Sequence, residues 1–157
     1  MMDTMFHIAL CEPEIPPNTG NIIRLCANSG AMLHLIHPLS FSLDEKPLRR
    51  AGLDYRDLAS VSEYTTLAEF VAATADKRLF ACTTRAQQLY SDADYRPGDI
   101  LLFGPESRGL PGEFLATLPE NRKIRIPMQT TTRSLNLSNA VAIILYEAWR
   151  QQEFGNR

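Results

Sequence analysis

The sequence has few cysteines, no long hydrophobic run and no excess of positive charge, and each shortage excludes a class of protein. Its three cysteines, Cys11, Cys26 and Cys82, form no CxxC pair and are too few for a disulfide framework. They are most simply small core residues in a reducing compartment. The longest apolar segment, residues 140–146, is far shorter than the roughly 20 residues that cross a bilayer. No basic stretch precedes an apolar one at the N-terminus, so we expect a cytoplasmic protein that does not associate with membranes.

The charge balance does not favour a polyanionic partner, because 16 basic and 18 acidic residues give a net charge of −2. Any affinity for nucleic acid must therefore reside in local clusters. Clusters of this size are as often ordinary solvated surface as binding sites. The candidates are Lys46, Arg49, Arg50 and Arg56 in one segment, and Arg122, Lys123, Arg125 and Arg133 in another.

The three histidines are not spaced as metal ligands. His34 and His37 are three apart in a predicted strand, which directs their side chains to opposite faces, and His7 stands alone. We therefore predict no metal site.

The length fits one domain over residues 1–157, because 157 residues with 45% hydrophobic content can bury a single core. Apolar periodicity and turn signals predict strands and helices that alternate along the chain. The wholly apolar run 100–103 is typical of a parallel strand covered on both faces. This order predicts an α/β fold, with a mostly parallel sheet flanked by helices. The predicted strands cover residues 6–10, 32–36, 60–63, 78–83, 100–103 and 123–127, and the predicted helices cover residues 18–28, 67–75, 111–118 and 138–152.

The last predicted helix is apolar around more of its circumference than the surface helix of a monomer. One side would pack on the sheet, and the other on a second copy of the chain in a homodimer, since two-fold pairing is the commonest oligomeric arrangement. Burial of the whole helix inside one subunit is the alternative. The apolar positions are Ala140, Val141, Ile143, Ile144, Leu145, Ala148 and Trp149.

Three polar turns each follow an apolar run, and we interpret them as one composite binding site. Glycines in such turns let a ligand approach the backbone, and Gly20, Gly104 and Gly109 suit that role. Neither GxGxxG after the first strand nor GxxxxGK[ST] occurs, so we do not expect a pyrophosphate to hold the ligand. The turns lie in residues 18–24, in residues 103–110 and within residues 126–150.

The third turn carries more polar side chains than a helix cap needs. Each of Ser134, Asn136, Ser138 and Asn139 is individually explained by capping. Together they offer the mixed donors and acceptors that read a neutral heterocycle such as adenine. Arg24 and Arg133 would supply cationic contacts to a phosphate or carboxylate.

The motifs NTGNIIRLCANSG, LLFGPESRGLP and IRIPMQTTTRSLNLSNAVAIILYEAWRQ resemble the three signature motifs of the SPOUT (trefoil-knot) RNA methyltransferases. The resemblance extends over residues 8–151. With EPEIPPNTGN and LRRAGLDY, the chain most resembles the small stand-alone members that methylate the ribose of the wobble nucleotide of transfer RNA. The resemblance implies a deep C-terminal trefoil knot, which general folding rules would not predict. It also implies S-adenosylmethionine as cofactor, with contacts at Cys82, Gly104, Ile126 and Ser134, mostly through backbone groups.

The resemblance also assigns roles to the remaining polar residues. Arg24 would be catalytic, by holding a phosphate or stabilising developing negative charge, because guanidinium does not give up its proton readily. Asn136 is the stronger expected contact to substrate. Further expected contacts to RNA are Asn18 and Asn21, which would fix the Arg24 turn or touch the ribose, together with Arg133 and Tyr146, and Glu106 would pair with Arg24 or orient the second turn.

The leading functional hypothesis is a homodimeric methyltransferase that acts on the 2'-hydroxyl of the wobble pyrimidine in the tRNA anticodon loop. Without a separate RNA-binding domain, two subunits would have to join their basic clusters into one groove. The alternatives are a ribosomal RNA 2'-O-methyltransferase of the same fold and a non-catalytic knot protein that binds RNA or cofactor. A Rossmann dehydrogenase would require turn chemistry that is absent.

Overall fold

All of the strand pairs in the described part of the chain are parallel. The structure is a computed structural model that describes residues 6–43, 61–129 and 134–157. Its sheet has six strands in the order β3-β2-β1-β5-β4-β6. The predicted α/β class with a mostly parallel sheet is therefore confirmed. The strands are β1 His7–Cys11, β2 Met32–Ile36, β3 Val61–Tyr64, β4 Leu79–Cys82, β5 Ile100–Phe103 and β6 Lys123–Ile124.

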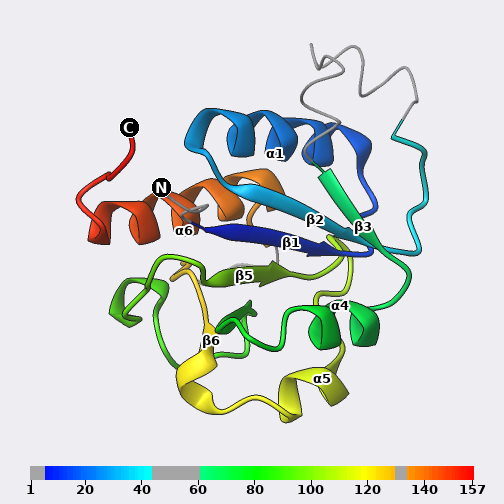
Figure 1. The fold of residues 1–157 in the computed structure, drawn as a ribbon. Helices are drawn as coiled ribbons and strands as arrows, with labels where there is room; N and C mark the ends of the chain where they lie inside the picture. The colour runs from blue at the N-terminus through cyan, green and yellow to red at the C-terminus, as the bar shows by residue number, and fades with distance from the viewer. Residues whose placement is uncertain (1–5, 44–60, 130–133) are drawn as a thin grey trace.

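Helices cover both faces of the sheet (Figure 1). On one face, α1 and α6 pack against each other and contribute to one apolar cluster. On the other face, α4 and α5 contribute Phe70 and Leu115 to a second cluster. No helix within the described ranges is long and apolar enough to span a bilayer. The helices are α1 Pro16–Ser29, α4 Leu67–Ala73, α5 Gly112–Ala116 and α6 Leu137–Gln151, and the short 3-10 turns are η1 Tyr90–Asp92 and η2 Glu120–Arg122.

Strand β5 lies between β1 and β4, and all four of its residues are buried. Its side chains alternate between the two apolar clusters: Leu101 and Phe103 belong to one, Ile100 and Leu102 to the other. This explains why the run is wholly apolar, since neither face of a central parallel strand contacts water.

Helix α1 begins two residues earlier than predicted. Pro16 and Pro17 form its first turn, where the sequence analysis expected them to precede the helix. The first amides of a helix have no acceptor within it, so proline costs nothing there and its fixed φ favours the helical turn. The helix ends at Ser29, one residue beyond the predicted limit, and Gly30 with a φ of 77° forms its C-cap.

Strand β6 has two residues, where five were predicted. Beyond Ile124 the chain no longer pairs with β4. Instead Arg125 forms an isolated parallel bridge with Leu89, outside the named strands. The predicted strand thus continues at Arg125 as a bridge to a loop, and the local sequence does not reveal that loop as its partner.

His7 does not stand alone, contrary to the sequence analysis. Its Nδ1 lies 2.9 Å from Nε2 of His34 on the neighbouring strand, and His34 Nδ1 lies 3.1 Å from the Tyr64 hydroxyl. His7 and His34 are diagonal neighbours on one face of the parallel pair β1 and β2, since Ala9 lies directly opposite His34. His37 pairs instead with Glu63 at 2.7 Å. Within the described ranges, no group of three or more His, Cys, Asp or Glu side chains is placed to hold a metal ion.

Candidate functional site

The three polar turns meet at one edge of the sheet. Because the strands are parallel, the carboxyl ends of β1, β5, β4 and β6 all face this edge. The first turn follows β1 and opens α1, the second follows β5, and the third leads from β6 into α6. Ligands of open parallel sheets bind at the carboxyl edge, so the predicted convergence has the geometry of a binding site.

Glu106 of the second turn is bonded to the first turn. Its carboxylate accepts hydrogen bonds from the backbone N–H of Glu14 at 2.8 Å and of Ile15 at 3.1 Å. It also accepts one from the Asn18 side-chain amide at 3.2 Å. A carboxylate that accepts several N–H groups forms charge-assisted bonds, which are stronger than neutral ones. Glu106 therefore orients the first turn, where the sequence analysis expected it to orient its own turn or pair with Arg24.

Glu14 makes the reciprocal contact from the first turn to the second. Its carboxylate accepts the Ser107 backbone N–H at 2.8 Å and the Ser107 hydroxyl at 2.9 Å. These bonds, led by the backbone N–H, lower the pKa of Glu14. Arg108 adds ion pairs to Glu12 at 2.9 Å and to Glu14 at 3.4 Å. Sequence reasoning did not identify Glu14 or Ser107, because an acidic residue in a loop gives no local sign of its partner.

Asn136 connects the third turn to the first. Its side-chain oxygen accepts the backbone N–H groups of Ser138 at 2.9 Å and Asn139 at 3.3 Å, which caps α6. Its amide nitrogen donates to the side-chain oxygen of Asn18 at 3.0 Å. Asn136 is therefore a helix cap that also bonds to the first turn, and its contact to substrate stays a prediction.

Asn18 lies at the centre of this arrangement and is 6% exposed. Its amide donates to Glu106 and its oxygen accepts from Asn136, so both ends of the side chain hold neighbouring turns. A contact from Asn18 to RNA stays a prediction, and its observed contacts are internal. Asn21 and Arg24 lie farther along α1, three residues apart on one exposed face.

The residues expected to contact the cofactor lie at adjacent strand ends. Cys82 is the last residue of β4 and is paired with Ile124, two residues before Ile126. The Thr83 N–H donates to the Ile124 carbonyl at 2.9 Å, which keeps the two chain segments side by side beyond the strands. Burial raises the pKa of the Cys82 thiol to about 12, so the thiol stays protonated and is not a nucleophile. These properties are compatible with a backbone contact at Cys82.

Gly104 follows β5 directly, and its lack of a side chain has a structural cause. A Cβ there would collide with the backbone of Gly109 and Leu110, because the second turn folds back against its own start. Gly109 itself has a φ of 70°, which favours glycine. Gly20 is buried inside α1 and is not in a tight turn, so its predicted role in a ligand-accommodating turn is wrong.

The remaining predicted residues divide between the described and undescribed parts of the chain. Ser134 and Tyr146 are exposed, the latter on α6. Arg133 lies outside the described residues, as do all members of the first basic cluster. In the second cluster, Lys123 pairs with Glu120 at 3.2 Å, and the Arg122 guanidinium lies 5.5 Å from the Phe80 ring centroid. These two cations therefore have structural contacts in the fold.

Comparison with known proteins identifies relatives over nearly the whole chain. Residues 5–146 match the model of the SpoU rRNA Methylase family. The tRNA (cytidine(34)-2'-O)-methyltransferase of Escherichia coli strain K12 is 55% identical over 147 residues, which are 94% of each protein.

Solved structures give the same result. A structure that concerns the 2-OH methylation of C/U34 on tRNA superimposes with a TM-score of 0.87 at 45% identity, covering 96% of this chain and 98% of that one. An AdoMet-bound rRNA methyltransferase from Sinorhizobium meliloti superimposes with a TM-score of 0.83 at 25% identity, covering 95% of this chain and 57% of that one.

Proposed function

Because the chain belongs to the SpoU rRNA Methylase family, we propose that it methylates the ribose 2'-hydroxyl of the wobble pyrimidine, nucleotide 34, of tRNA. The observation that carries this proposal is the 55% identity, over 94% of both proteins, to a tRNA (cytidine(34)-2'-O)-methyltransferase. At that coverage the likeness includes all three turns of the site. The ribosomal alternative is not favoured, since the relatives at this level of identity are named for tRNA.

S-adenosylmethionine is the proposed cofactor, held at the carboxyl edge of β4, β5 and β6. When bound, it supplies an electrophilic methyl group on a positively charged sulfur. The described groups of the third turn, at residues 134–139, are neutral: backbone amides and carbonyls, and Ser and Asn side chains. That donor set fits an adenosine better than a pyrophosphate. Cys82, Gly104, Ile126 and Ser134 would hold it, mainly through the main chain.

Arg24 is the proposed catalytic residue, with Asn136 beside the substrate. A guanidinium keeps its proton at any physiological pH, so Arg24 binds the phosphate next to the ribose or stabilises negative charge on the 2'-oxygen. The 2'-hydroxyl proton then passes to water. Asn21 lies on the same exposed face of α1 and would contact the same nucleotide. Rate enhancement by such a site comes largely from orienting the two reactants.

The proposed assembly is a homodimer that uses the exposed face of α6. Val141, Ile144 and Leu145 are buried against the sheet and α1, whereas Ile143 is 36% and Tyr146 39% exposed on the opposite side. This fits the expected two-sided packing of α6. Sedimentation velocity tests it: Ile143→Asp should produce monomers while wild-type protein sediments as a dimer, and a monomeric wild type would refute the assembly.

RNA recognition is proposed to combine basic residues from both subunits. The candidates, Lys46, Arg49, Arg50 and Arg133, lie outside the described residues. Tyr146, on the exposed face of α6, would lie at the dimer interface or near the RNA. Because the net charge is −2, binding should depend on these local cations and weaken steeply with salt. Since tRNA is the proposed substrate, the proposed location of the protein is the cytoplasm.

Methyl transfer to defined RNAs tests the proposal. Purified protein with labelled S-adenosylmethionine should modify tRNA isolated from cells that lack the gene, and mass spectrometry should locate the label on the ribose of nucleotide 34. Label in ribosomal RNA alone would favour the ribosomal alternative. Cofactor binding without transfer to any RNA would favour a non-catalytic binding protein.

A further inference from the structure

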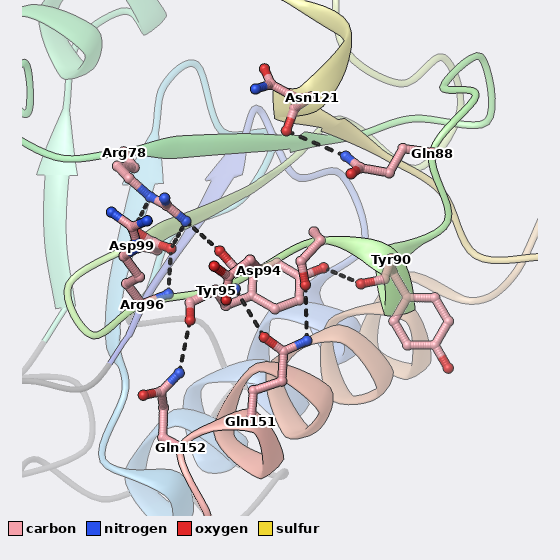
Figure 2. Close-up of polar contacts among 11 residues, drawn as sticks. Arg78, Gln88, Tyr90, Asp94, Tyr95, Arg96, Asp99, Asn121, Gln151 and Gln152 are labelled. Carbon is pink, nitrogen blue, oxygen red and sulfur yellow. Dashed lines mark hydrogen bonds and ion pairs between the residues drawn. The ribbon is translucent and has the colours of Figure 1, made fainter.

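The connection between β4 and β5 is fastened to the end of α6. The side-chain oxygen of Gln151 accepts the Tyr95 backbone N–H at 2.9 Å, and its amide nitrogen donates to the Ala93 carbonyl at 2.9 Å. Gln152 donates to the Tyr95 carbonyl at 2.8 Å. Figure 2 shows both glutamines reaching from the helix to this segment, residues 90–95. Three bonds thus join the last turn of α6 to a loop more than 50 residues earlier, with separations of 56 to 58 positions.

Tyr95 connects the 90–95 segment to the apolar core. Its side chain is 1% exposed and packs edge-on against Phe80 of β4, with ring centroids 5.2 Å apart. Its hydroxyl donates to the Tyr90 carbonyl at 2.5 Å. Burial raises the pKa of Tyr95, so this hydroxyl remains a donor at all working pH values.

Tyr90 in turn holds the backbone that follows β6. Its N–H donates to the Arg125 carbonyl at 2.8 Å, and the Arg125 N–H donates to the Gln88 carbonyl at 3.0 Å. The Gln88 side chain also donates to the carbonyls of Asn121 and Lys123, each at 3.3 Å. The residue after Arg125 is Ile126, the proposed cofactor contact. The chain immediately before Ile126 is therefore held by residues 88–90 in place of a sheet strand.

The other end of the 90–95 segment is fixed by a buried ion pair. Asp99 is 2% exposed, and its carboxylate accepts from Arg78 Nε at 3.0 Å and Nη2 at 2.9 Å. It also accepts the Arg96 backbone N–H at 2.7 Å. Arg78 donates to the Asp94 carbonyl as well. Arg78 and Asp99 directly precede β4 and β5, so these bonds fix the 90–95 segment at the start of both strands (Figure 2).

We propose that Tyr95 and Gln151 are positioning residues for the cofactor site, acting through Tyr90 and Arg125 on the backbone at Ile126. The inference rests on the proposed function, since Ile126 is a cofactor contact only if the protein binds S-adenosylmethionine. Neither residue touches a reacting atom. Their effect is to hold one wall of the cofactor site at a fixed distance from α6, whose N-cap is Asn136.

The test compares two tyrosine-to-phenylalanine variants that each lose a single hydroxyl. Tyr95→Phe removes the bond to Tyr90 and keeps the buried ring, while Tyr64→Phe removes a hydroxyl near His34 on β3, away from this loop. Losing one net hydrogen bond should weaken S-adenosylmethionine binding by about two- to tenfold in Tyr95→Phe, with the KM for tRNA unchanged. Amide exchange at Tyr90 and Arg125, measured without cofactor, should quicken by a similar factor. Tyr64→Phe should match wild type in all three measurements.

Gln151→Met provides the second variant, because it keeps the side-chain length and removes the bonds to Tyr95 and Ala93, together with one to Glu147 on the same helix. It should reproduce the exchange and affinity changes of Tyr95→Phe. Wild-type cofactor affinity in both variants would overturn the inference, and so would equal losses in Tyr64→Phe. If wild-type protein itself fails to bind S-adenosylmethionine in calorimetry, the proposed function fails. If wild type binds and the variants bind equally well, only this inference fails.

Discussion

The side-chain amide of Asn136 donates a hydrogen bond to the side-chain oxygen of Asn18 over 3.0 Å, although the two residues are 118 positions apart. Asn18 in turn donates to Glu106, so one chain of side chains connects all three polar turns. Each member is fixed by a partner from another turn. Damage to any one of the turns should therefore affect the geometry of the others, which gives the site several specific tests.

Asn136→Ala should impair both stability and catalysis. The variant loses the cap of α6, which typically contributes about 0.5–2 kcal/mol to the free energy of unfolding, and loses the bond to Asn18. Urea unfolding measures the first effect, and single-turnover methyl transfer measures the second. Asn28→Ala is the matched control, because that exposed residue near the end of α1 lies outside the three turns. Equal activity in the two variants would contradict a special role for Asn136.

Glu106→Gln should destabilise the protein by about 1–3 kcal/mol, because its new NH₂ group would face a backbone or side-chain donor where the carboxylate accepted. Glu113→Gln, an exposed change of the same kind on α5, should unfold like wild type. Thermal and urea unfolding compare the two. A Glu106→Gln protein as stable as Glu113→Gln would show that the link between the first two turns contributes little.

Gly104→Ala should disrupt the second turn, since a methyl group there collides with the backbone of Gly109 and Leu110. Backbone cannot yield as a flexible side chain does, so we expect a loss of about 2 kcal/mol or more. At Gly112 a methyl group would lie 3.3 Å from the end of the mobile Arg85 side chain, so Gly112→Ala should be tolerated. Thermal unfolding of the two variants, followed by circular dichroism, tests this prediction. Equal melting temperatures would contradict the tight turn at Gly104.

Arg24→Ala should fold and bind S-adenosylmethionine nearly as wild type does, yet lose about 100-fold or more in the rate of methyl transfer, a typical effect of removing a group that stabilises transition-state charge. Arg24 is exposed on α1, so few packing contacts are lost. Arg157→Ala at the C-terminus is the control for loss of a cation. Unchanged single-turnover rates in Arg24→Ala would remove this residue from the mechanism.

The free energy of unfolding should fall as the pH decreases from about 6.5 to about 4. Burial, with smaller effects of His7 and Lys77, lowers the pKa of His34 from 6.5 to about 4. The unfolded chain then binds a proton across this window while the folded chain does not, so protonation favours unfolding. The expected loss is about 1–3 kcal/mol between pH 7 and pH 4.5. Urea titrations should show a shallower pH slope for His34→Gln than for the wild-type protein, and an unchanged slope would contradict this role of His34.

Several elements were predictable because their causes are local. The bounds of β2 and β5 match the predicted segments, since apolar runs bordered by turn residues leave little choice of limits. The predicted end of the first helix, residue 28, lies one residue before the observed end at Ser29. The resemblance to the SPOUT methyltransferases is confirmed by the family match and by the solved structures, and with it the predicted fold class. That part of the prediction came from three motifs in order, since general folding rules would have excluded a knot.

The site was predicted less completely, because side-chain partners far apart in sequence leave no local signal. The motifs correctly indicated that three turns converge. They did not indicate that Glu106 accepts the Glu14 N–H, or that Glu14 accepts the Ser107 N–H, across more than 90 positions. Helical spacing placed Asn18 and Arg24 on one helix, yet only the packed structure buries the first and exposes the second. The predicted length of β6 and the expected isolation of His7 were wrong for the same reason, since both depend on a neighbouring segment.

The sequence by itself determined the alternation of strands and helices, the chemical character of the three turns and the family. Each of these depends on the types of the residues and on their order along the chain. The tertiary structure decided which polar groups satisfy one another: Glu106 with the first turn, Asn136 with Asn18, and Gln151 with Tyr95. Buried and half-buried polar groups require partners, and only the folded chain fixes which donor and acceptor come within 3 Å.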